Sequence, residues 1–387
     1  MNQRIEFVLR AMKTDNFRAL CKEFGISAKT GYKWRERFVQ NGLAGVEEES
    51  RRPKSSPGGL GEAVVCDIIR IKQKHLTWGP RKIRAVYTRT HSETPSESSF
   101  KRVLERAGYT EKRRARPVGQ AGRLCSGRQA TAPNEIWTVD FKGWWHGAQG
   151  RCEPLTVRDE FSRYLLDLRA LPNAEGKTVR VAFERLFELH GLPEAIRSDN
   201  GAPFAHVAGL LGLTRLSAWW VALGIDLERG RPGCPQDNGA HERLHLDISR
   251  ELEKQRVEQQ AALDEWRRTF NEERPHEALG LRTPAQLYAP SGKKFEGTPE
   301  DLTYSGMETR KVHRKGYIDW AGQRFFLSSA LGGWSVGVES TPEAGRWNVW
   351  FGRLLIGQID EATAAFERAA PTECPQENAP ANAGKEQ

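Results

Sequence analysis

The stretch EIWTVDFKGWW, residues 135–145, marks a change in the pattern of the chain. Helical periods precede it, whereas its own apolar and β-branched residues predict a strand. Beyond it, EPLTVRDEFSRYLLDLRAL predicts one or two further strands, EGKTVRVAFERLFELHG an amphipathic helix ending at Gly191, and PEAIRSDNG a short strand. LLGLTRLSAWWVALG (210–224) then predicts a helix, IDLERGRP a strand, and residues 237–256 a long helix. This alternation of strands and helices predicts an α/β domain.

Two helices joined by a tight turn are predicted upstream, in FRALCKEFGISAKTGYKWRERF (17–38). Gly25 interrupts the helical pattern, and Ser27 is placed to cap the second helix. Such a pair is a helix-turn-helix, whose second helix enters the major groove of DNA. A plain helical hairpin is the structural alternative. Three residues would be exposed on the second helix and are candidate DNA contacts: Lys29, Thr30 and Lys33.

A second small helical unit is predicted over residues 60–110, after a linker of charged residues, Pro, Ser and Gly. Pro80 stands near the first turn of one predicted helix. Ser96 is placed to cap the next helix, which ends at Gly108. That last helix carries three basic residues that suit contact with DNA phosphate: Lys101, Arg102 and Arg106.

The C-terminal part of the chain changes pattern again at about residue 302, where the hydrophobic period shortens to two. Several short strands with Gly-containing turns predict a small antiparallel β-barrel. The last residues are rich in Pro, Ala and Glu and are expected to be disordered. The expected organisation is a helix-turn-helix domain (1–47), a second helical DNA-binding domain (60–110), a basic linker (111–133), the α/β domain with its following helices (134–291), the barrel (302–362) and a disordered tail (367–387).

The composition suits a cytoplasmic protein with a polyanionic partner, and ordinary solvated surface charge is the alternative. The net charge is +9 and the isoelectric point about 9.3, which suits a polyanionic partner because basic residues that neutralise phosphates release counterions. The six cysteines are scattered and form no C-x-x-C pair, so they are expected to be free thiols in a reducing compartment. No apolar run is long enough to cross a bilayer, and the N-terminus lacks the apolar region of a signal peptide. We therefore expect no membrane partner.

The stretch GCPQDNGAHERLH, residues 233–245, can be interpreted in two ways. HERLH fits the H-E-x-x-H signature of zinc metallopeptidases, with Glu242 as general base beside a histidine-bound zinc. The alternative is a turn that leads into a helix, on which Glu242 is an isolated acid that binds magnesium. The motif alone does not distinguish these interpretations.

Three acids are placed for magnesium chemistry, because Mg²⁺ prefers hard oxygen ligands and two-metal phosphoryl transfer needs acids that converge from separate elements. Asp140 lies between hydrophobic neighbours in a strand, where a lone carboxylate is costly. Asp199 ends a strand, and Glu242 lies one turn into a helix. Each has a structural alternative, since Asp-Asn-Gly is common in turns and Glu242 could be a surface acid. Asn238 shares the face of Glu242 and is a further candidate DNA contact.

The chain resembles an insertion-sequence transposase of the retroviral-integrase-like DDE superfamily. The motifs WTVDF, RDEFSRY, SDNGAPF and PQDNGAHER match the successive motifs of the catalytic core, and FNEERPHEAL with TPAQLY matches the segment after it. With the helix-turn-helix start and the terminal barrel, the resemblance covers roughly residues 5–360. It implies a ribonuclease-H-like core with a mixed five-stranded sheet, and it assigns the catalytic triad and metal ligands to Asp140, Asp199 and Glu242.

The resemblance also implies a reaction and its partners. Two Mg²⁺ or Mn²⁺ ions would assist cleavage at each element end, and the freed 3′-hydroxyl would attack target DNA. The partners are then double-stranded DNA, as terminal repeats and as target, and further copies of the chain in a homo-oligomer. The spacing between Asp199 and Glu242 is longer than is typical of the family's integrases. A longer helix over 210–224, by about two turns, would account for the difference.

Two other functions are compatible with parts of the sequence. A zinc peptidase would use HERLH, but no Gly or His follows at the spacing that metzincins use for a third ligand. A domesticated, non-catalytic transposase used as a repressor would be expected to lose a triad acid, and none is lost. Within HERLH we expect His241 to face DNA or solvent, and His245 to be a candidate accessory residue near the metal or the scissile phosphate.

Overall fold

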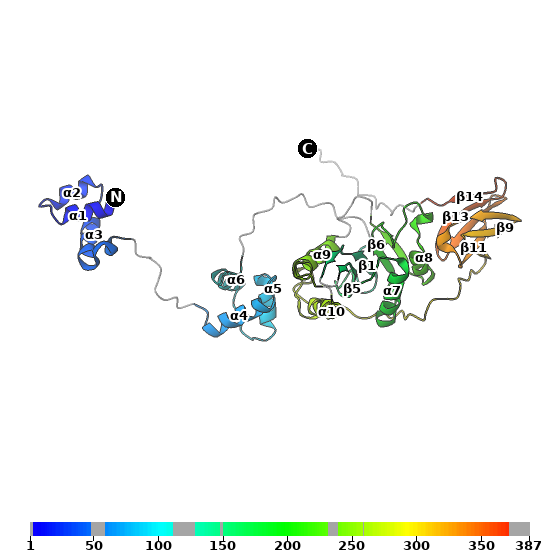
Figure 1. Ribbon diagram of the computed structural model, residues 1–387, viewed down its shortest axis with the longest axis horizontal. Coiled ribbons are helices and arrows are strands. Elements are labelled where there is room, and N and C mark those ends of the chain that lie inside the picture. Colours follow the sequence, from blue (N-terminus) through cyan, green and yellow to red (C-terminus); the bar gives the residue numbers. More distant parts are fainter. Residues whose placement is uncertain are drawn as a thin grey trace, which may run out of the picture. The chain divides into compact units, whose positions relative to one another are not determined.

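The computed structural model describes residues 3–47, 59–110, 128–147, 150–230, 239–257 and 259–370 of the 387-residue chain (Figure 1). The chain divides into two compact units, Met1–Gly61 and Glu62–Gln387. Over the described ranges, none of the helices combines the length and apolar character needed to cross a membrane.

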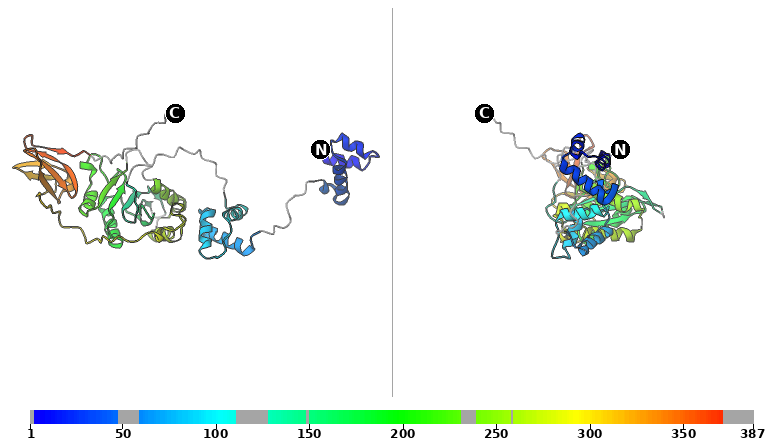
Figure 2. Two further views of the ribbon diagram at one scale, coloured as in Figure 1. Left: turned by 180° about the vertical axis from the view of Figure 1, so that it is seen from behind. Right: turned by 90° about the vertical axis from the view of Figure 1, so that its left-hand side faces the viewer.

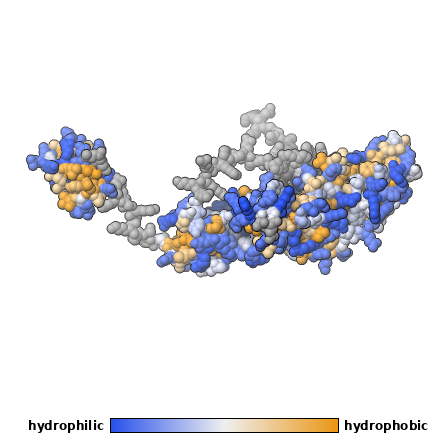
Figure 3. All heavy atoms as spheres, in the orientation of Figure 1, coloured by the Kyte–Doolittle hydropathy of each residue, from blue (hydrophilic) through white to orange (hydrophobic). Residues whose placement is uncertain are grey.

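The N-terminal unit is a three-helix bundle that contains the predicted helix-turn-helix. Its helices are α1 (Gln3–Ala11), α2 (Phe17–Glu23) and α3 (Ala28–Asn41). The turn between α2 and α3 forms as predicted, with Gly25 at φ 63° and the Ser27 hydroxyl accepting from the Thr30 amide at 3.1 Å. Figure 3 shows apolar residues at the surface of this unit, where five large hydrophobic side chains are exposed: Leu9, Met12, Tyr32, Val39 and Leu43.

The predicted second helical unit is also present, as α4 (Glu62–Lys74), α5 (Pro80–Thr88) and α6 (Glu97–Arg106). Ser96 caps α6 as predicted, and Gly108 follows the helix with φ 75°. The three helices bury an apolar core: Ile68, Ile83, Tyr87, Phe100 and Leu104. The sequence pattern therefore placed these helices and their caps correctly.

The α/β domain is built on a mixed five-stranded sheet in the order β5-β4-β1-β6-β7. Its strands are β1 (Ile136–Phe141), β4 (Pro154–Asp159), β5 (Leu165–Ala170), β6 (Ala195–Ser198) and β7 (Asp226–Arg229). β1 pairs antiparallel with β4 and parallel with β6, and β7 continues the parallel half. A short hairpin of β2 (Trp145–His146) and β3 (Arg151–Cys152) lies between β1 and β4 in the chain.

Helices cover both faces of this sheet (Figures 1 and 2). On one face, α7 (Gly176–His190) and α8 (Arg215–Ala222) bury aromatic side chains against Trp137 and Val139 of β1. On the other face, α9 (Gly239–Glu251) and α10 (Gln260–Arg268) pack with Leu165 and Leu168 of β5. Because successive strand residues point to opposite faces, Thr138 and Asp140 of β1 belong to the face of α9.

The predicted helix over 210–224 is wrong in its first part. Residues Leu210–Gly212 form a 3₁₀ turn, and α8 begins only after Thr214, whose side chain forms a capping box with Ser217. α8 has eight residues, so a longer helix does not account for the longer spacing between Asp199 and Glu242. The next predicted helix is also shorter than expected, because α9 ends at Glu251 and a 3₁₀ turn, Glu253–Gln255, follows.

The C-terminal strands form an open antiparallel sheet in the order β14-β13-β12-β11-β8. They are β8 (Glu308–Lys311), β11 (Ser335–Ser340), β12 (Arg346–Phe351), β13 (Leu354–Asp360) and β14 (Ala365–Arg368). A separate hairpin of β9 (Tyr317–Trp320) and β10 (Gln323–Phe326) lies beside β8 and β14. No strand pairing closes the described strands into a ring, so the expected barrel is not confirmed.

The C-terminal sheet shares a hydrophobic core with the α/β domain. Ala218, Val221 and Ala222 of α8 pack among the apolar residues of this sheet, while Trp219 and Trp220 pack against β1 and α7. α8 is therefore buried on both sides. β14 extends to Arg368, two residues into the stretch expected to be a disordered tail. Residues 371–387 of that tail and 111–127 of the expected linker lie outside the described residues.

Candidate active site

Asp140 and Asp199 lie at the same edge of the mixed sheet. Asp140 is near the end of β1, and its register partner on β4 is Thr156. In the parallel pair of β1 and β6, Val139 is opposite Ser198, and Asp199 follows directly. The carboxyl ends of neighbouring parallel strands therefore bring the two carboxylates together, at the edge where open α/β sheets bind ligands.

The electrostatics of Asp140 are consistent with this proximity. Burial first, and then the negative charge of Asp199, raise the pKa of Asp140 to about 7, although a hydrogen bond from the Phe141 amide acts in the opposite direction. Two adjacent carboxylates repel each other, and a divalent cation between them would relieve that repulsion. Oxygen ligands of this kind fit Mg²⁺ or Mn²⁺ better than they fit softer metals.

The turn that carries Asp199 is closely packed. A Cβ atom added at Gly201 would lie 2.9 Å from Asp199 Oδ2, so this position has room only for glycine unless the carboxylate moves. Asn200 donates its side-chain amide to the Gly230 carbonyl at 2.7 Å. Arg229 Nη1 donates to Ser198 Oγ and to the Phe204 carbonyl, both at 2.9 Å. Burial lowers the pKa of Arg229 to about 10, and the charge of Asp199 opposes that shift.

Glu242 lies in the first turn of α9 and is exposed. Among the described residues, no three His, Cys, Asp or Glu side chains lie close enough together to hold a metal ion, so the structure brings Asp140 and Asp199 together but not Glu242. Its neighbour His241, however, contacts β1 and β4 directly. Glu242 is thus on the flank of a helix that is fixed to the strands beside Asp140.

The prediction that His241 faces DNA or solvent is wrong. The side chain is fully buried, with Nδ1 3.0 Å from Thr138 Oγ1 and Nε2 2.6 Å from Thr156 Oγ1. The reason is that β1 and β4 present two hydroxyls to this face of α9, which satisfy both ring nitrogens. Burial first, and then the positive charge of Arg158, hold the pKa of His241 well below its usual range, so the ring is neutral.

His245 approaches Asp140, as an accessory residue would have to do. Its Nδ1 is 3.9 Å from Asp140 Oδ2, and its Nε2 is 3.0 Å from Thr156 Oγ1. Burial lowers the pKa of His245 to about 4, with smaller contributions from Lys142 and Arg158. The Nε2 atoms of both HERLH histidines therefore face one threonine hydroxyl, an arrangement that packs α9 on the sheet and does not resemble a zinc site.

The candidate DNA-binding residues have different environments. Lys29 and Lys33 are exposed on α3, but Thr30 is half-buried and its hydroxyl lies 2.9 Å from Ser27 Oγ, within the helix cap. Asn238 lies outside the described residues. On α6 the three predicted basic residues are all exposed: Lys101, Arg102 and Arg106.

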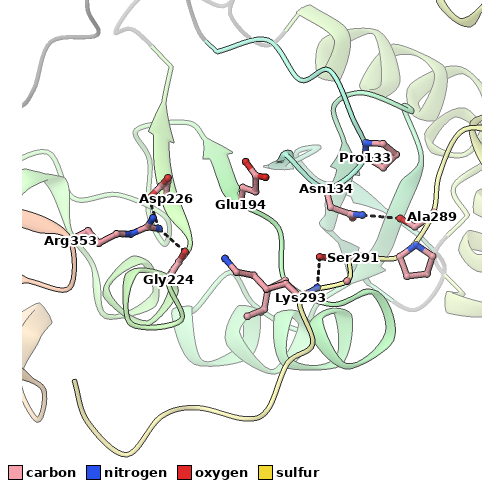
Figure 4. Close-up of a pocket in the computed structure, with 12 residues that line it drawn as sticks. Pro133, Asn134, Glu194, Gly224, Asp226, Ala289, Ser291, Lys293 and Arg353 are labelled. Carbon is pink, nitrogen blue, oxygen red and sulfur yellow. Dashed lines mark hydrogen bonds and ion pairs between the residues drawn. The ribbon is translucent and has the colours of Figure 1, made fainter. Parts of the chain in front are cut away.

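A separate pocket of about 550 Å³ lies at the opposite ends of the parallel strands (Figure 4). Asn134 precedes β1, Glu194 precedes β6 and Asp226 begins β7, and all three line it. Arg353 reaches in from the C-terminal sheet and donates to the Gly224 carbonyl and to Asp226. The pocket is therefore distinct from the edge that carries Asp140 and Asp199.

Sequence reasoning missed three residues that shape the site: Thr138, Thr156 and Arg229. The two threonines alternate with apolar residues in β1 and β4, so their period of two gave a signal that they share the face of Asp140. Nothing in the sequence near Arg229 indicates its contacts, because its partners Ser198 and Phe204 belong to a distant segment of the chain.

Family comparisons agree with this architecture. Residues 130–235 and 223–284 match two families described as integrase core domains. Residues 3–54 match a helix-turn-helix domain, residues 30–104 a homeodomain-like domain, and residues 307–366 the C-terminal domain of IS481 family transposases.

Several individual proteins are also similar. The 31.7 kDa protein of insertion element IS407 from Burkholderia multivorans is 25% identical over 254 residues, covering 64% of this chain and 88% of the relative. The 39.2 kDa protein of insertion element IS476 from Xanthomonas euvesicatoria is 27% identical over 257 residues, covering 64% and 70%. The Gag-Pol polyprotein of baboon endogenous virus is 28% identical over 244 residues, covering 61% of this chain and 13% of the polyprotein.

Among solved structures, the catalytic core domain of HTLV-2 integrase in complex with magnesium is 19% identical with a TM-score of 0.33, covering 41% of this chain and 99% of that one. A chain of the simian T-cell lymphotropic virus intasome is 17% identical with a TM-score of 0.36, covering 76% and 96%. From its integrase core, its helix-turn-helix domain and its transposase C-terminal domain, the chain belongs to the insertion-sequence transposases of the retroviral-integrase-like DDE superfamily.

Proposed function

We propose that this DDE transposase cuts and joins DNA with a triad of Asp140, Asp199 and Glu242 that holds two divalent cations, Mg²⁺ or Mn²⁺. The observation that supports it most is the position of Asp140 and Asp199 at the carboxyl ends of adjacent parallel strands. Glu242 would complete the triad from the first turn of α9 when DNA and cations are present. His245, 3.9 Å from Asp140, is the accessory residue of this proposal.

The donor set fits hard cations. The two carboxylates, on β1 and just after β6, are close enough for the charge of one to act on the other, and carboxylate oxygens are the ligands that Mg²⁺ takes from proteins beside water and phosphate. When bound, the cations would activate the attacking hydroxyl and stabilise the leaving oxygen. The aspartates would orient that assembly, and the fixed sheet edge would hold the scissile phosphate in line with its nucleophile.

The reaction has two steps on this site. In the first, a water oxygen attacks the phosphodiester at an element end, and the bond to the 3′ oxygen breaks, which leaves a 3′-hydroxyl. In the second, that hydroxyl attacks a target phosphodiester and displaces the adjoining 3′ oxygen. Both steps exchange one P–O bond for another, so no covalent enzyme intermediate is required.

The remaining assignments concern recognition. Lys29, Thr30 and Lys33 on α3 would contact the terminal repeats, together with Lys101, Arg102 and Arg106 on α6, and Asn238 would contact DNA near the active site. The substrates are double-stranded element ends and target DNA. Holding two ends at once requires more than one protomer, so we infer a homo-oligomer, which acts on DNA in the bacterial cytoplasm.

One assay tests the catalytic proposal: full-length protein, labelled element ends and Mg²⁺, with nicked and joined strands as the readout. Asp140→Asn, Asp199→Asn and Glu242→Gln should each lower cleavage by about 1000-fold or more, because several kcal/mol of transition-state stabilisation are lost. End binding should persist in these variants. End binding by the unmodified protein should fall steeply as salt rises, and Lys29→Ala with Lys33→Ala should weaken that binding and make it less dependent on salt.

Asp226→Asn is the matched control, since it makes the same carboxylate-to-amide change on an exposed residue at the opposite end of β7. It should cleave like the unmodified protein. A triad variant that retains near-normal cleavage would remove its residue from the triad. Binding of ends without any cleavage by the unmodified protein would favour a repressor.

A further inference from the structure

Arg229 is a charged residue beside the active site that the proposed mechanism does not use. It is the last residue of β7, and its register partner in the parallel pair with β6 is Ser198. Asp199 is the next residue, so Arg229 lies at the same sheet edge as the two aspartates. Asp199 and Arg229 are close enough for the charge of one to act on the other.

The hydrogen bonds of Arg229 join the two ends of the turn that carries Asp199. Nη1 donates to Ser198 Oγ, directly before Asp199, and to the carbonyl of Phe204, five residues after it, both at 2.9 Å. One guanidinium nitrogen thus spans the whole turn. The neighbouring Asn200 is bound to the Gly230 carbonyl, so the turn is attached to the end of β7 at two points.

The same guanidinium leaves the Asp199 carboxylate available. Arg229 donates no hydrogen bond to Asp199 in the described part of the chain, and its Nη2 is buried without a partner there. A buried, incompletely paired arginine is costly to a fold. The stability of the fold alone does not explain why an arginine lies here. A need to hold the 198–204 turn in one conformation explains it better.

We propose that Arg229 is the positioning residue for Asp199: it ties the 198–204 turn to β7 and so holds the Asp199 carboxylate toward Asp140 for a divalent cation. The inference rests on the proposed metal site and adds the residue that organises it.

The direction in which metal affinity changes when Arg229 is replaced distinguishes a positioning role from a purely electrostatic role. A positive charge beside a metal-binding carboxylate repels a cation, so removing the charge alone would tighten metal binding. Removing a residue that positions a ligand weakens it, typically by 10-fold to 100-fold. If Arg229 acts by positioning, its loss must weaken the binding of a cation although it removes a positive charge.

The test is Mn²⁺ binding to the full-length protein without DNA, measured by isothermal titration calorimetry. Arg229→Met should raise the Kd for Mn²⁺ about 10-fold. Arg229→Lys should remain closer to the unmodified protein, because a lysine ammonium can donate to both oxygens. Arg197→Met is the matched control, since Arg197 is a largely buried arginine of β6 whose partners are Glu228 and the Arg128 carbonyl. It should bind Mn²⁺ normally.

Two further variants keep the outcomes distinct. Asp199→Asn should abolish Mn²⁺ binding, and if it does not, the proposed metal site is wrong. If Asp199→Asn loses binding but Arg229→Met binds Mn²⁺ as well as or better than the unmodified protein, only the role of Arg229 is overturned. Should Arg229→Met not fold, Ser198→Ala decides, because it removes one tether and keeps the charge: weaker binding supports positioning, and unchanged binding overturns it.

Discussion

The two faces of the mixed sheet are covered by different kinds of contact. Against α7 and α8, the sheet presents Trp137 and Val139 to the rings of Phe183 and Trp220, and this core is almost entirely apolar. Against α9, it presents the hydroxyls of Thr138 and Thr156 to the rings of His241 and His245. Both faces bury an apolar cluster, which on the α9 side includes Leu244 and Ile248, but the α9 side adds these directional bonds.

The difference bears on the proposed active site, because its proposed third acid, Glu242, lies on α9. Apolar burial is non-directional, so it does not by itself fix how one polar group is oriented toward another. Hydrogen bonds lose strength when their distance or angle changes, so they fix a helix in one register. In the proposed site α9 presents Glu242 to the sheet edge, and its hydrogen-bonded anchor would supply the accuracy that such a site requires.

The largest effect on stability is expected from the apolar face. Phe183→Ala removes a fully buried ring from α7 and should lower the free energy of unfolding by about 3–5 kcal/mol, measured by urea denaturation. Val181→Ala on the same helix, where the side chain is 65% exposed, should change it by less than about 0.5 kcal/mol. Equal losses in the two variants would contradict the assignment of this face as the main source of stability.

A smaller loss of stability, with a larger loss of function, is expected from the polar face. His241→Ala leaves the hydroxyls of Thr138 and Thr156 without this partner and should lower the free energy of unfolding by about 1–3 kcal/mol. Cleavage by the folded variant should fall by about 100-fold, because a displaced α9 misplaces Glu242. Phe183→Ala, assayed where it is folded, should keep its cleavage. The comparison fails if both variants lose activity only in proportion to unfolding.

Acid should destabilise both faces through their buried histidines. Burial lowers the pKa of His190 on α7 and of His245 on α9 to about 4, so both are neutral when folded and gain a proton on unfolding below pH 6.5. Their stabilising contribution is complete above pH 6.5 and declines as the pH falls toward 4, by about 1.4 kcal/mol per pH unit for each proton gained. Asp140 acts in the opposite sense, because stability linked to its raised pKa is lost as the pH rises through about 7.

His190→Leu should remove the contribution of this histidine to the pH dependence of stability. The measurement is the free energy of unfolding at pH 7 and at pH 4.5. Cleavage at neutral pH should stay normal, since His190 packs with Tyr164 and Tyr288 away from the acids. An unchanged slope in this variant would show that His190 is already protonated in the folded protein.

The sequence was sufficient for features that depend on local pattern. The apolar run around Asp140 predicted β1, and the position of Ser27 and Gly25 predicted the turn of the helix-turn-helix. The capping box of Thr214 with Ser217 is a local feature too, because both residues lie within one turn of the chain. It indicates the start of α8 correctly.

Features that depend on distant partners could not be predicted. Nothing local to His241 indicates that Thr138 and Thr156 face it, because those hydroxyls are brought there by sheet formation. The C-terminal strands were recognised from their period of two, but that period does not say whether the first and last strands pair. The resemblance assigned the proposed triad, whereas the contacts of nearby residues such as Arg229 were found only in the structure.

The order of the strands has a consequence for how the protein is made. β1, β4 and β5 follow one another in the chain and can pair as they are synthesised, but β6 joins the other side of β1 only after α7 has been made. The helices of the DNA-binding domains leave the ribosome before any of these strands. A growing chain therefore completes its N-terminal helices while Asp140 still lacks Asp199 at its side, and the C-terminal strands are made after both acids.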